Sequence, residues 1–329
     1  MTQHLLAKRL VPVLLLAAVL GLLSLLVPDF LGTRNMLGLL LSVTLVGTIA
    51  ATMMLVLAMR EVDLSVGSTV ALAGVLAAVC MSATGSIALG VLAGLAGGAL
   101  VGFANGVLVA GFKVNSLIVT LAMMEVVRGL AFLASGGESV AIPLQGFYEL
   151  GSGGMLGLSW PIWSMLLSFG VFGVILKRTV FGRNILAIGG NPEAARLAGV
   201  PIVRVRILVF TLQGLVAGLA GIILAARITS GQPNTSVGLE LAVISACVLG
   251  GVSLSGGLAT IGGVIIGVLI MGAAQNALNL LNVPTFYQYV VRGGILLLAV
   301  VADRLRQDGR LPRLGVRSPP TDRSSPLNA

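Results

Sequence analysis

The sequence predicts an all-α, polytopic membrane protein with about ten transmembrane helices. Hydrophobic residues make up 57% of its 329 residues and charged residues only 9%, and its mean hydropathy is +1.07. Soluble domains carry roughly 25% charged residues, so a surface with this little charge must face lipid. The 45 glycines agree with this class, because small residues allow membrane helices to pack closely.

Ten apolar segments are candidates to cross a bilayer, which takes about 20 residues in a helix. The first follows Lys8 and Arg9 and is longer than the roughly 7–15 apolar residues of a signal peptide, so we interpret it as a retained span. The eighth is short, and we expect it to begin near Val237 or to be partly re-entrant. The predicted spans are 10–27, 36–58, 66–84, 87–110, 115–134, 160–176, 207–226, 241–253, 259–281 and 287–303.

The distribution of Lys and Arg predicts the orientation. Sixteen of the twenty lie on one side of the spans if both termini share that side, and six of these fall in the connection 177–206. Cytoplasmic loops carry such an excess, so both termini and this inner loop are predicted to be cytoplasmic. The connection 135–159 has no Lys or Arg and is expected outside. Because the basic residues follow this topology and lack interleaved aromatics, they indicate a membrane protein and no nucleic-acid partner.

Two domains of unequal kind follow from composition. Residues 1–308 form the predicted transmembrane domain, with lipid as its surroundings. The tail 309–329 is rich in Pro, Ser and Arg and is predicted to be a disordered cytoplasmic tail.

Four short motifs recur in the same order in the two halves of the chain. They match spans 2 to 5 with spans 7 to 10, and an offset of five spans makes the partners run in opposite directions. This predicts two inverted-topology halves, which are typical of transporters with a pathway near the repeat interface. The matched pairs are 57–60 with 224–227, 65–67 with 236–238, Asn105 with Asn276, and 126–129 with 290–293.

The inner loop contains a short predicted helix, 192–198, with a full set of start and stop signals. Asn191 is a favourable N-cap, Pro192 fits the first helical position, and Glu193 suits the positive end of the helix dipole. Gly199 suits the left-handed residue that ends a helix, and Pro201 prevents continuation. A pre-folded helix on the basic side indicates a docking element.

Ionisable residues near or inside the spans are candidates for a translocation path or gate. Glu125 and Arg128 lie three apart on one helix face and could act in gating. The structural alternative, an ion pair or pairing with Arg292 and backbone carbonyls, is favoured over gating. Asp63 could line an inner gate or simply start the span that follows it.

Small and amide residues in the spans allow similar alternatives. Asn105 and Asn276 could contact a hydroxylated substrate or make interhelical hydrogen bonds. Glycines at every fourth position of the fourth span predict close helix packing rather than a binding role: 90, 94, 98, 102 and 106.

The sequence predicts no catalytic residue, no metal site and no cofactor bound by this chain. It lacks the GxxxxGK[ST] phosphate loop, HExxH, GxSxG and CxxC. Cys80 and Cys247 lie in apolar spans and are interpreted as small hydrophobic residues. If ATP drives this protein, a different chain must bind it.

Several motifs resemble the permease subunits of sugar ABC importers, in their ribose/arabinose/galactoside branch. The resemblance covers nearly the whole chain up to about residue 307. In the inner loop it rests on Phe181-Gly182-Arg183-Asn184 and on the segments 187–191 and 193–200. It continues through 63–68, 230–233, 238–241 and 248–257.

This resemblance implies a transport subunit that is not itself an enzyme, in the bacterial inner membrane, with an architecture like that of vitamin B12 importers. It implies a homodimer with a second copy of the chain, a cytoplasmic ATPase that uses ATP and Mg, and a periplasmic sugar-binding protein. The helix in the inner loop would be the coupling helix. The residues implied to couple to the ATPase are Arg183, Asn191, Glu193, Ala194, Ala195, Arg196, Leu197 and Gly199.

The implied substrate is a monosaccharide. The segments 246–254, 279–282 and 289–293 are similar to those of L-arabinose permeases, which favours L-arabinose. Ribose, xylose, galactosides or autoinducer-2 are the alternatives within the branch. Outside it, the inverted repeat and Glu125 leave open an ion-coupled secondary transporter, and a membrane-embedded assembly factor is a third reading.

Overall fold

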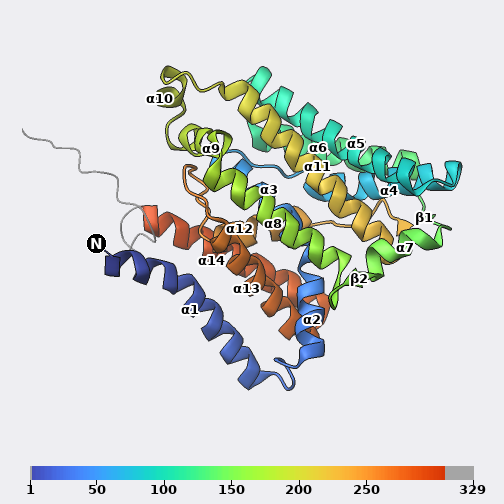
Figure 1. The fold of residues 1–329 in the computed structure, drawn as a ribbon, viewed down its shortest axis with the longest axis horizontal. Coiled ribbons are helices and arrows are strands. Elements are labelled where there is room, and N and C mark those ends of the chain that lie inside the picture. Colours follow the sequence, from blue (N-terminus) through green and yellow to red (C-terminus); the bar gives the residue numbers. More distant parts are fainter. Residues whose placement is uncertain (1, 308–329) are drawn as a thin grey trace, which may run out of the picture.

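The computed structural model describes residues 2–307, and most of them lie in helices (Figure 1). Four two-residue strands lie in the connections: β1 (Val140–Ala141), β2 (Gly154–Met155), β3 (Leu158–Ser159) and β4 (Ser230–Gly231). The helices are α1 (Thr2–Leu26), α2 (Thr33–Ser42), α3 (Thr44–Ala58), α4 (Val66–Thr84), α5 (Ile87–Gly106) with the π-helical turn η1 (Val107–Gly111), α6 (Ser116–Ser135), α7 (Gln145–Ser152), α8 (Trp160–Arg178), α9 (Val180–Gly190), α10 (Pro192–Leu197), α11 (Ile202–Ile228), α12 (Leu239–Leu249), α13 (Ile261–Leu280) and α14 (Thr285–Gln307).

Every predicted span coincides with a helical segment, and the membrane-protein class is confirmed. Within the described residues six helices are long and apolar enough to cross a bilayer, namely α4, α5 with η1, α6, α8, α11 and α13. The bent pair α2–α3 gives a seventh if it is counted as one span. Three further apolar segments, Val13–Leu26, Leu239–Leu249 and Thr285–Val301, are shorter. The predicted ten spans are reached only if each of these three shorter segments also crosses the membrane. The predicted tail 309–329 lies outside the described residues.

The span predicted at 36–58 is not a single straight helix. Its two parts, α2 and α3, meet at Val43 at an angle of 47°. The hydroxyls of Ser42 and Thr44 donate to the carbonyl oxygens of Leu39 and Leu41 at 2.7 and 2.8 Å. Such side-chain bonds compete with the helix's own hydrogen bonds and favour bending.

The eighth span is a short helix, as its sequence suggested, but it does not extend to Val237. Ser236 and Gly238 have φ values of 61° and 78°, which a helix cannot contain, so α12 begins at Leu239. Its 11 residues span about 16 Å at 1.5 Å per residue, roughly half of the hydrocarbon core. The irregular connection 250–260 follows it.

The connection 135–159 is more structured than a plain loop. It contains α7 and the β2–β3 hairpin, and β1 pairs antiparallel with β4 after α11, with Val140 opposite Gly231. These strand pairs are small exceptions to the all-α prediction.

The glycine stripe of α5 packs against α4 and α11, as predicted. A Cβ built on Gly98 would lie 2.4 Å from the carbonyl oxygen of Gly214, and one on Gly102 would lie 2.2 Å from that of Phe210. Real Cβ atoms do not approach so closely, so these positions require glycine. The stripe brings the backbones of α5 and α11 into direct contact.

The helices of the two halves pack against one another in a matching pattern. In the first half α4 packs against α5 and α6, and in the second half α12 packs against α13 and α14. Across the halves α3 packs against α12 and α11 packs against α4. This is the contact pattern expected if α3 to α6 correspond to α11 to α14.

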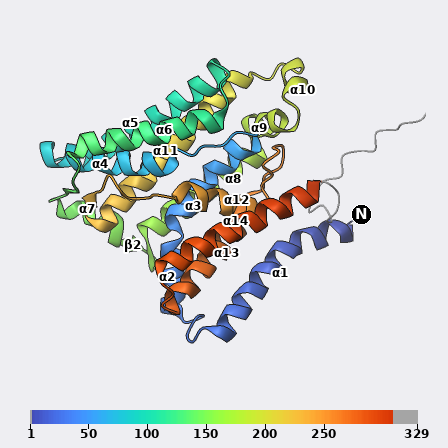
Figure 2. The same cartoon turned by 180° about the vertical axis from the view of Figure 1, so that it is seen from behind.

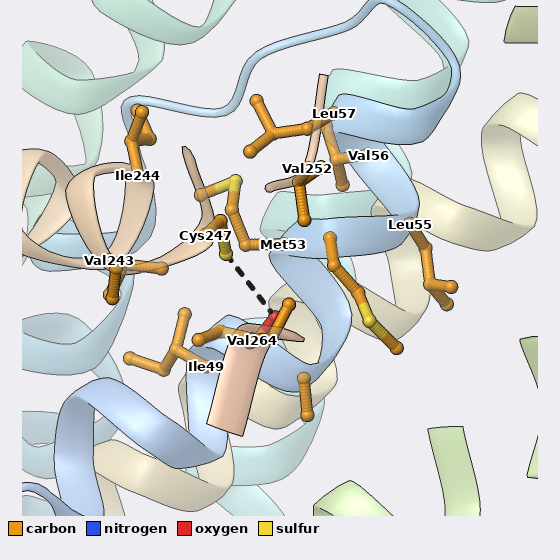
Figure 3. Packing of buried hydrophobic residues seen from close by; sticks show 14 of the residues in the cluster. Ile49, Met53, Leu55, Val56, Leu57, Val243, Ile244, Cys247, Val252 and Val264 are labelled. Carbon is orange, nitrogen blue, oxygen red and sulfur yellow. Dashed lines mark hydrogen bonds between the residues drawn. The ribbon is translucent and has the colours of Figure 1, made fainter. Parts of the chain in front are cut away.

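The largest buried cluster lies where the halves meet, between α3, α12 and α13 (Figure 3). Met53 and Ile49 of α3 lie beside Val243 and Cys247 of α12. The thiol of Cys247 donates to the carbonyl oxygen of Ala50 at 3.6 Å. Cys80 and Cys247 are both free thiols, and Cys247 serves as a small hydrophobic residue.

Figures 1 and 2 show how the elements divide between the two ends of the molecule. The helices α9 and α10 lie toward the same end as the start of α1 and the end of α14. The opposite end carries α7 and the strand pairs. The helices α9 and α10, the start of α1 and the end of α14 are thus gathered on one side.

Candidate functional site

The most distinctive candidate site is α10, which lies at a corner of the molecule beyond the end of α9 (Figure 1). Its start is fixed by Asn191, whose side-chain oxygen accepts hydrogen bonds from the backbone N–H groups of Glu193 and Ala194, both at 3.1 Å. Pro192 occupies the first turn. This is the N-cap that the sequence predicts, and it satisfies donors that the helix itself cannot.

The end of α10 is equally well defined. The N–H of Gly199 donates to the carbonyl oxygen of Arg196, and that of Val200 donates to Ala195, both at 3.0 Å. Gly199 has a φ of 79°, a left-handed conformation that costs a residue with a Cβ about 1–2 kcal/mol. The turn after α10 is therefore set by hydrogen bonds and backbone conformation within the loop itself.

The outer face of α10 is small, mixed in charge and open. Ala195 is buried against the protein, whereas Leu197 is 77% exposed. Arg196 donates to Glu193 from its Nε at 3.1 Å, within an ion pair of 2.5 Å. This hydrogen bond lowers the pKa of Glu193 and raises that of Arg196. Both groups stay charged near neutral pH. The exposed face of α10 therefore carries the Glu193–Arg196 ion pair beside the exposed side chain of Leu197.

The helix before α10 completes the inner loop. The Thr179 hydroxyl caps α9 by accepting from the N–H of Gly182 at 3.1 Å. Arg183 follows on its exposed side. The residues of the predicted coupling set lie on α9, on α10, at the N-cap between them or in the turn after α10, and the side chain of Ala195 is buried.

Two of the predicted path residues, Asp63 and Asn105, are joined through Ser65. Asp63 is 1% exposed, and its Oδ1 accepts from the N–H and the hydroxyl of Ser65 at 2.9 and 2.6 Å. The Ser65 hydroxyl oxygen in turn accepts from Nδ2 of Asn105 on α5 at 2.9 Å. Asn105 is fully buried, and its Oδ1 has no hydrogen-bond partner among the described residues. Ser65, and not Asp63, is the N-cap of α4, and it makes no side-chain cap bond. Asp63 orders Ser65, which links it to Asn105 on α5.

For Arg128, the structure shows one of the alternatives that the sequence left open, which is contact with backbone carbonyls. Arg128 donates from Nη1 to the carbonyl oxygens of Pro233 and Thr235 at 2.6 and 2.8 Å. Glu125 lies on the exposed side of α6. Arg128 satisfies its charge on backbone carbonyls because the connection before α12 passes within its reach, which was the alternative left open by the sequence.

The second-half counterparts make different contacts. Asn276 and Asn35 form a reciprocal amide pair at 2.9 and 3.0 Å, which joins α13 to α2. Arg292 lies over the ring of Tyr289 at 5.8 Å and donates to Oε1 of Gln275 at 3.3 Å. Among the six candidates for the path or gate, Asp63 and Asn105 are thus the two that hydrogen-bond to the same residue, Ser65.

Three charged residues that the sequence did not single out as site candidates contact the helices on either side of α10. Arg60 donates to the last carbonyls of α9, and Glu61 pairs with Arg206 at the start of α11. The clue in the sequence was a pair of adjacent charges, Arg60 and Glu61, set between two apolar spans. In the part of the chain that the structure describes, no three His, Cys, Asp or Glu side chains gather as a metal site would require.

The comparisons with known proteins point to one family. Residues 35–300 match the family model described as branched-chain amino acid transport system / permease component. No solved structure matches the chain.

The curated relatives are importer permeases for sugars. The chain is 61% identical to the L-arabinose ABC transporter permease protein AraH of Azospirillum brasilense, over 88% of this chain and 85% of the relative. It is 54% identical to the L-arabinose transport system permease protein AraH of Escherichia coli K12, over 86% and 87%. It is 42% identical to the ribose import permease protein RbsC of Bacillus subtilis, over 90% and 93%.

Proposed function

The chain belongs to the ABC transport permease family described as branched-chain amino acid transport system / permease component, and from that premise we propose that it is the membrane-spanning permease subunit of an ABC importer for L-arabinose. The observation that carries the substrate is the 61% identity to an L-arabinose permease over most of both chains. The ribose permeases among its relatives are more distant, at 42% or less for those compared, so ribose is the second candidate. Xylose, galactosides and autoinducer-2 are weaker candidates.

The proposed assembly has this chain as a homodimer in the bacterial inner membrane, with both termini cytoplasmic. Each copy would span the membrane about ten times in two inverted halves, with an architecture like that of vitamin B12 importers. The reciprocal packing of α3 on α12 and of α11 on α4 supports the inverted halves. Periplasmic sugar-binding protein would deliver the substrate at the end that carries α7 and the strand pairs.

We further propose that α10 docks on a cytoplasmic ATPase and acts as the coupling helix. Its capped ends, its exposed Leu197 and its fixed pair of Glu193 and Arg196 suit a rigid element that fits a preformed cleft. Rigidity matters because a docking element that must first fold spends part of its binding free energy on ordering. ATP and Mg would be bound and used by that ATPase, so this chain would be a transport subunit and bind no cofactor itself.

The path of the sugar is proposed to run near the meeting of the two halves. Asn105 supports this with a buried carbonyl oxygen that is free to accept a hydroxyl hydrogen bond. Asp63 and Arg128 are proposed to hold the adjoining connections in place, since their bonds go to neighbouring backbone and hydroxyl groups. Asn276, Arg292 and Glu125 remain candidates for the path.

The decisive experiment is uptake in proteoliposomes that contain the purified chain, the ATPase of the same system, and the sugar-binding protein. L-arabinose should enter only when all three proteins and ATP are present. Uptake by this chain alone under an ion gradient would establish an ion-coupled carrier instead. ATP-driven entry of ribose in preference to L-arabinose would correct the substrate but leave the transporter class intact.

The docking role of α10 is tested in the same vesicles. Gly199→Val strains the turn after α10, and we expect it to weaken binding of the ATPase and to reduce uptake together. The control is Gly129→Ala on α6, where a Cβ meets nothing within 4 Å. Normal ATPase binding by Gly199→Val would remove α10 from the interface.

A further inference from the structure

The connection between α3 and α4 contacts a different element at almost every residue. We refer to residues 60–65 as the inner hub. Glu61, Asp63 and Ser65 are buried within it, while Arg60 reaches outward along the surface. The hub therefore lies between the inner loop and the membrane-spanning helices.

Arg60 holds the segment that enters α10. Its Nε donates to the carbonyl oxygen of Gly189 at 2.6 Å and its Nη2 to that of Gly190 at 2.8 Å. These are the last two carbonyls of α9, which lack helical partners and carry the negative end of the helix dipole. A cation with two donors in a fixed fork suits both features.

The backbone around this contact is equally close. A Cβ on Gly189 would lie 1.7 Å from the carbonyl oxygen of Ala58, so only glycine fits there. The same oxygen accepts from the N–H of Gly257 at 2.9 Å. The end of α9, one residue before the N-cap of α10, is thus fixed to the end of α3.

Glu61 holds the segment that leaves α10. Its Oε1 lies 3.0 Å from Nη2 of Arg206, near the start of α11. The two side chains are only 10% and 24% exposed, so the pair is shielded from solvent. The consecutive residues Arg60 and Glu61 therefore bind the chain just before and just after α10.

The other residues of the hub face the membrane-spanning helices. The N–H of Val62 donates to the Ser116 hydroxyl at 3.2 Å, and its carbonyl oxygen accepts from the Thr120 hydroxyl at 3.3 Å, both on α6. Ser65, the N-cap of α4, joins Asp63 to Asn105 on α5. Buried, hydrogen-bonded segments of this kind transmit displacement because they shift as units rather than deform.

From this arrangement we propose that the inner hub transmits movement of α10 to α4, α5 and α6. Arg60 and Glu61 are the positioning residues, because they bind the ends of α9 and α11 that flank α10. The inference rests on the proposed docking of an ATPase at α10. A displacement of α10 would pull on Arg60 through α9 and on Glu61 through α11. Because these two residues are adjacent, the displacement would reach the start of α4 as one movement.

The test separates transmission from docking by measuring three quantities on the complete complex in proteoliposomes. These are binding of the ATPase, ATP hydrolysis, and sugar transported per ATP hydrolysed. The main variant is the double substitution Glu61→Gln with Arg206→Gln, which leaves no unpaired buried charge. We expect ATPase binding and hydrolysis to persist while sugar transported per ATP falls about tenfold, the size of a typical coupling between sites.

Two further variants make the interpretation specific. The exchanged pair Glu61→Arg with Arg206→Glu should restore most of the lost transport, since it restores the attraction. Arg60→Lys keeps the charge but loses the two-donor guanidinium group. Its sugar transported per ATP should lie between that of wild type and that of Arg60→Met. Lys113→Met, a basic residue in the connection before α6, is the control and should behave as wild type.

Unchanged transport in the double variant would overturn the proposal. So would a parallel loss of ATPase binding and transport, because the hub would then serve only docking or folding. Failure of the exchanged pair to restore transport would exclude the Glu61–Arg206 link. Absence of ATP-driven uptake by the wild-type complex would instead refute the proposed function, and the hub proposal with it.

Discussion

At the scale of single residues, Asp63 is the most deeply buried charged group among the described residues. It lies in the connection between α3 and α4, buried, with both of its hydrogen bonds coming from Ser65. Burial raises the pKa of Asp63, and the two bonds from Ser65 oppose that rise only in part. The carboxylate is tolerated because it orders the start of α4 rather than because its charge is paired.

This raised pKa predicts how stability depends on pH. A group whose pKa is higher in the folded state stabilises the fold fully below its unfolded pKa, and that contribution is lost as pH rises through the folded pKa. On lowering the pH from neutral, wild type should therefore gain stability relative to Asp63→Asn, whose amide oxygen can keep the bonds from Ser65. Thermal unfolding of both proteins in detergent at several pH values measures the difference. Parallel pH profiles would show that Asp63 does not titrate differently in the folded state.

At the same scale, side-chain partners were the hardest feature to predict. The spacing of Glu125 and Arg128 placed them on one helix face, and the structure agrees, yet Arg128 binds the carbonyls of Pro233 and Thr235 instead. Those carbonyls come from a connection 105 and 107 positions away in the chain. No local spacing rule contains that information.

At the scale of elements, the contact between α5 and α11 depends on the glycine stripe. Gly98 and Gly102 of α5 face Gly214 of α11 so closely that backbone touches backbone. Without a strong hydrophobic drive between helices in lipid, such packing supplies much of their association. The regular four-residue spacing made this element predictable, because a face of a helix is determined by sequence period alone.

Gly102→Ala should therefore destabilise the fold. The added Cβ would meet the carbonyl oxygen of Phe210 and push α5 from α11, at a cost of about 1–3 kcal/mol for overpacking. Thermal unfolding in detergent measures the loss, with Gly129→Ala as the matched control in open space. Equal stability of the two variants would mean that α5 and α11 pack more loosely than the structure indicates.

The other elements were predictable where nearby residues determine them and were missed where they depend on distant contacts or carry no local signal. The capping signals of α10 are local and were read correctly, since N-cap and stop residues act within a few positions. The bend between α2 and α3 was missed because no Pro or Gly marks it. The strands β1 and β4 were missed because each is two residues long and pairs only with a distant segment.

At the scale of the whole molecule, the arrangement predicts which surfaces face which side of the membrane. In a variant whose own thiols are replaced (Cys80→Ala with Cys247→Ala), a single cysteine at Ala198 should react with an impermeant reagent only from the cytoplasmic side. A cysteine at Ser139, in the connection before β1, should react only from the periplasmic side. Oriented membrane vesicles distinguish the two. Labelling of both from one side would contradict the proposed topology.

The sequence by itself determined the class of the protein, the positions of its apolar spans and the capped helix α10. Hydropathy, charge asymmetry and capping are properties of consecutive residues, so they can be read without a fold. Only the tertiary structure decided that Arg60 reaches Gly189, 129 positions later, and that Glu61 reaches Arg206. The reason is physical: a charge between apolar spans must find a partner, but the folded path of the chain determines which one comes within reach.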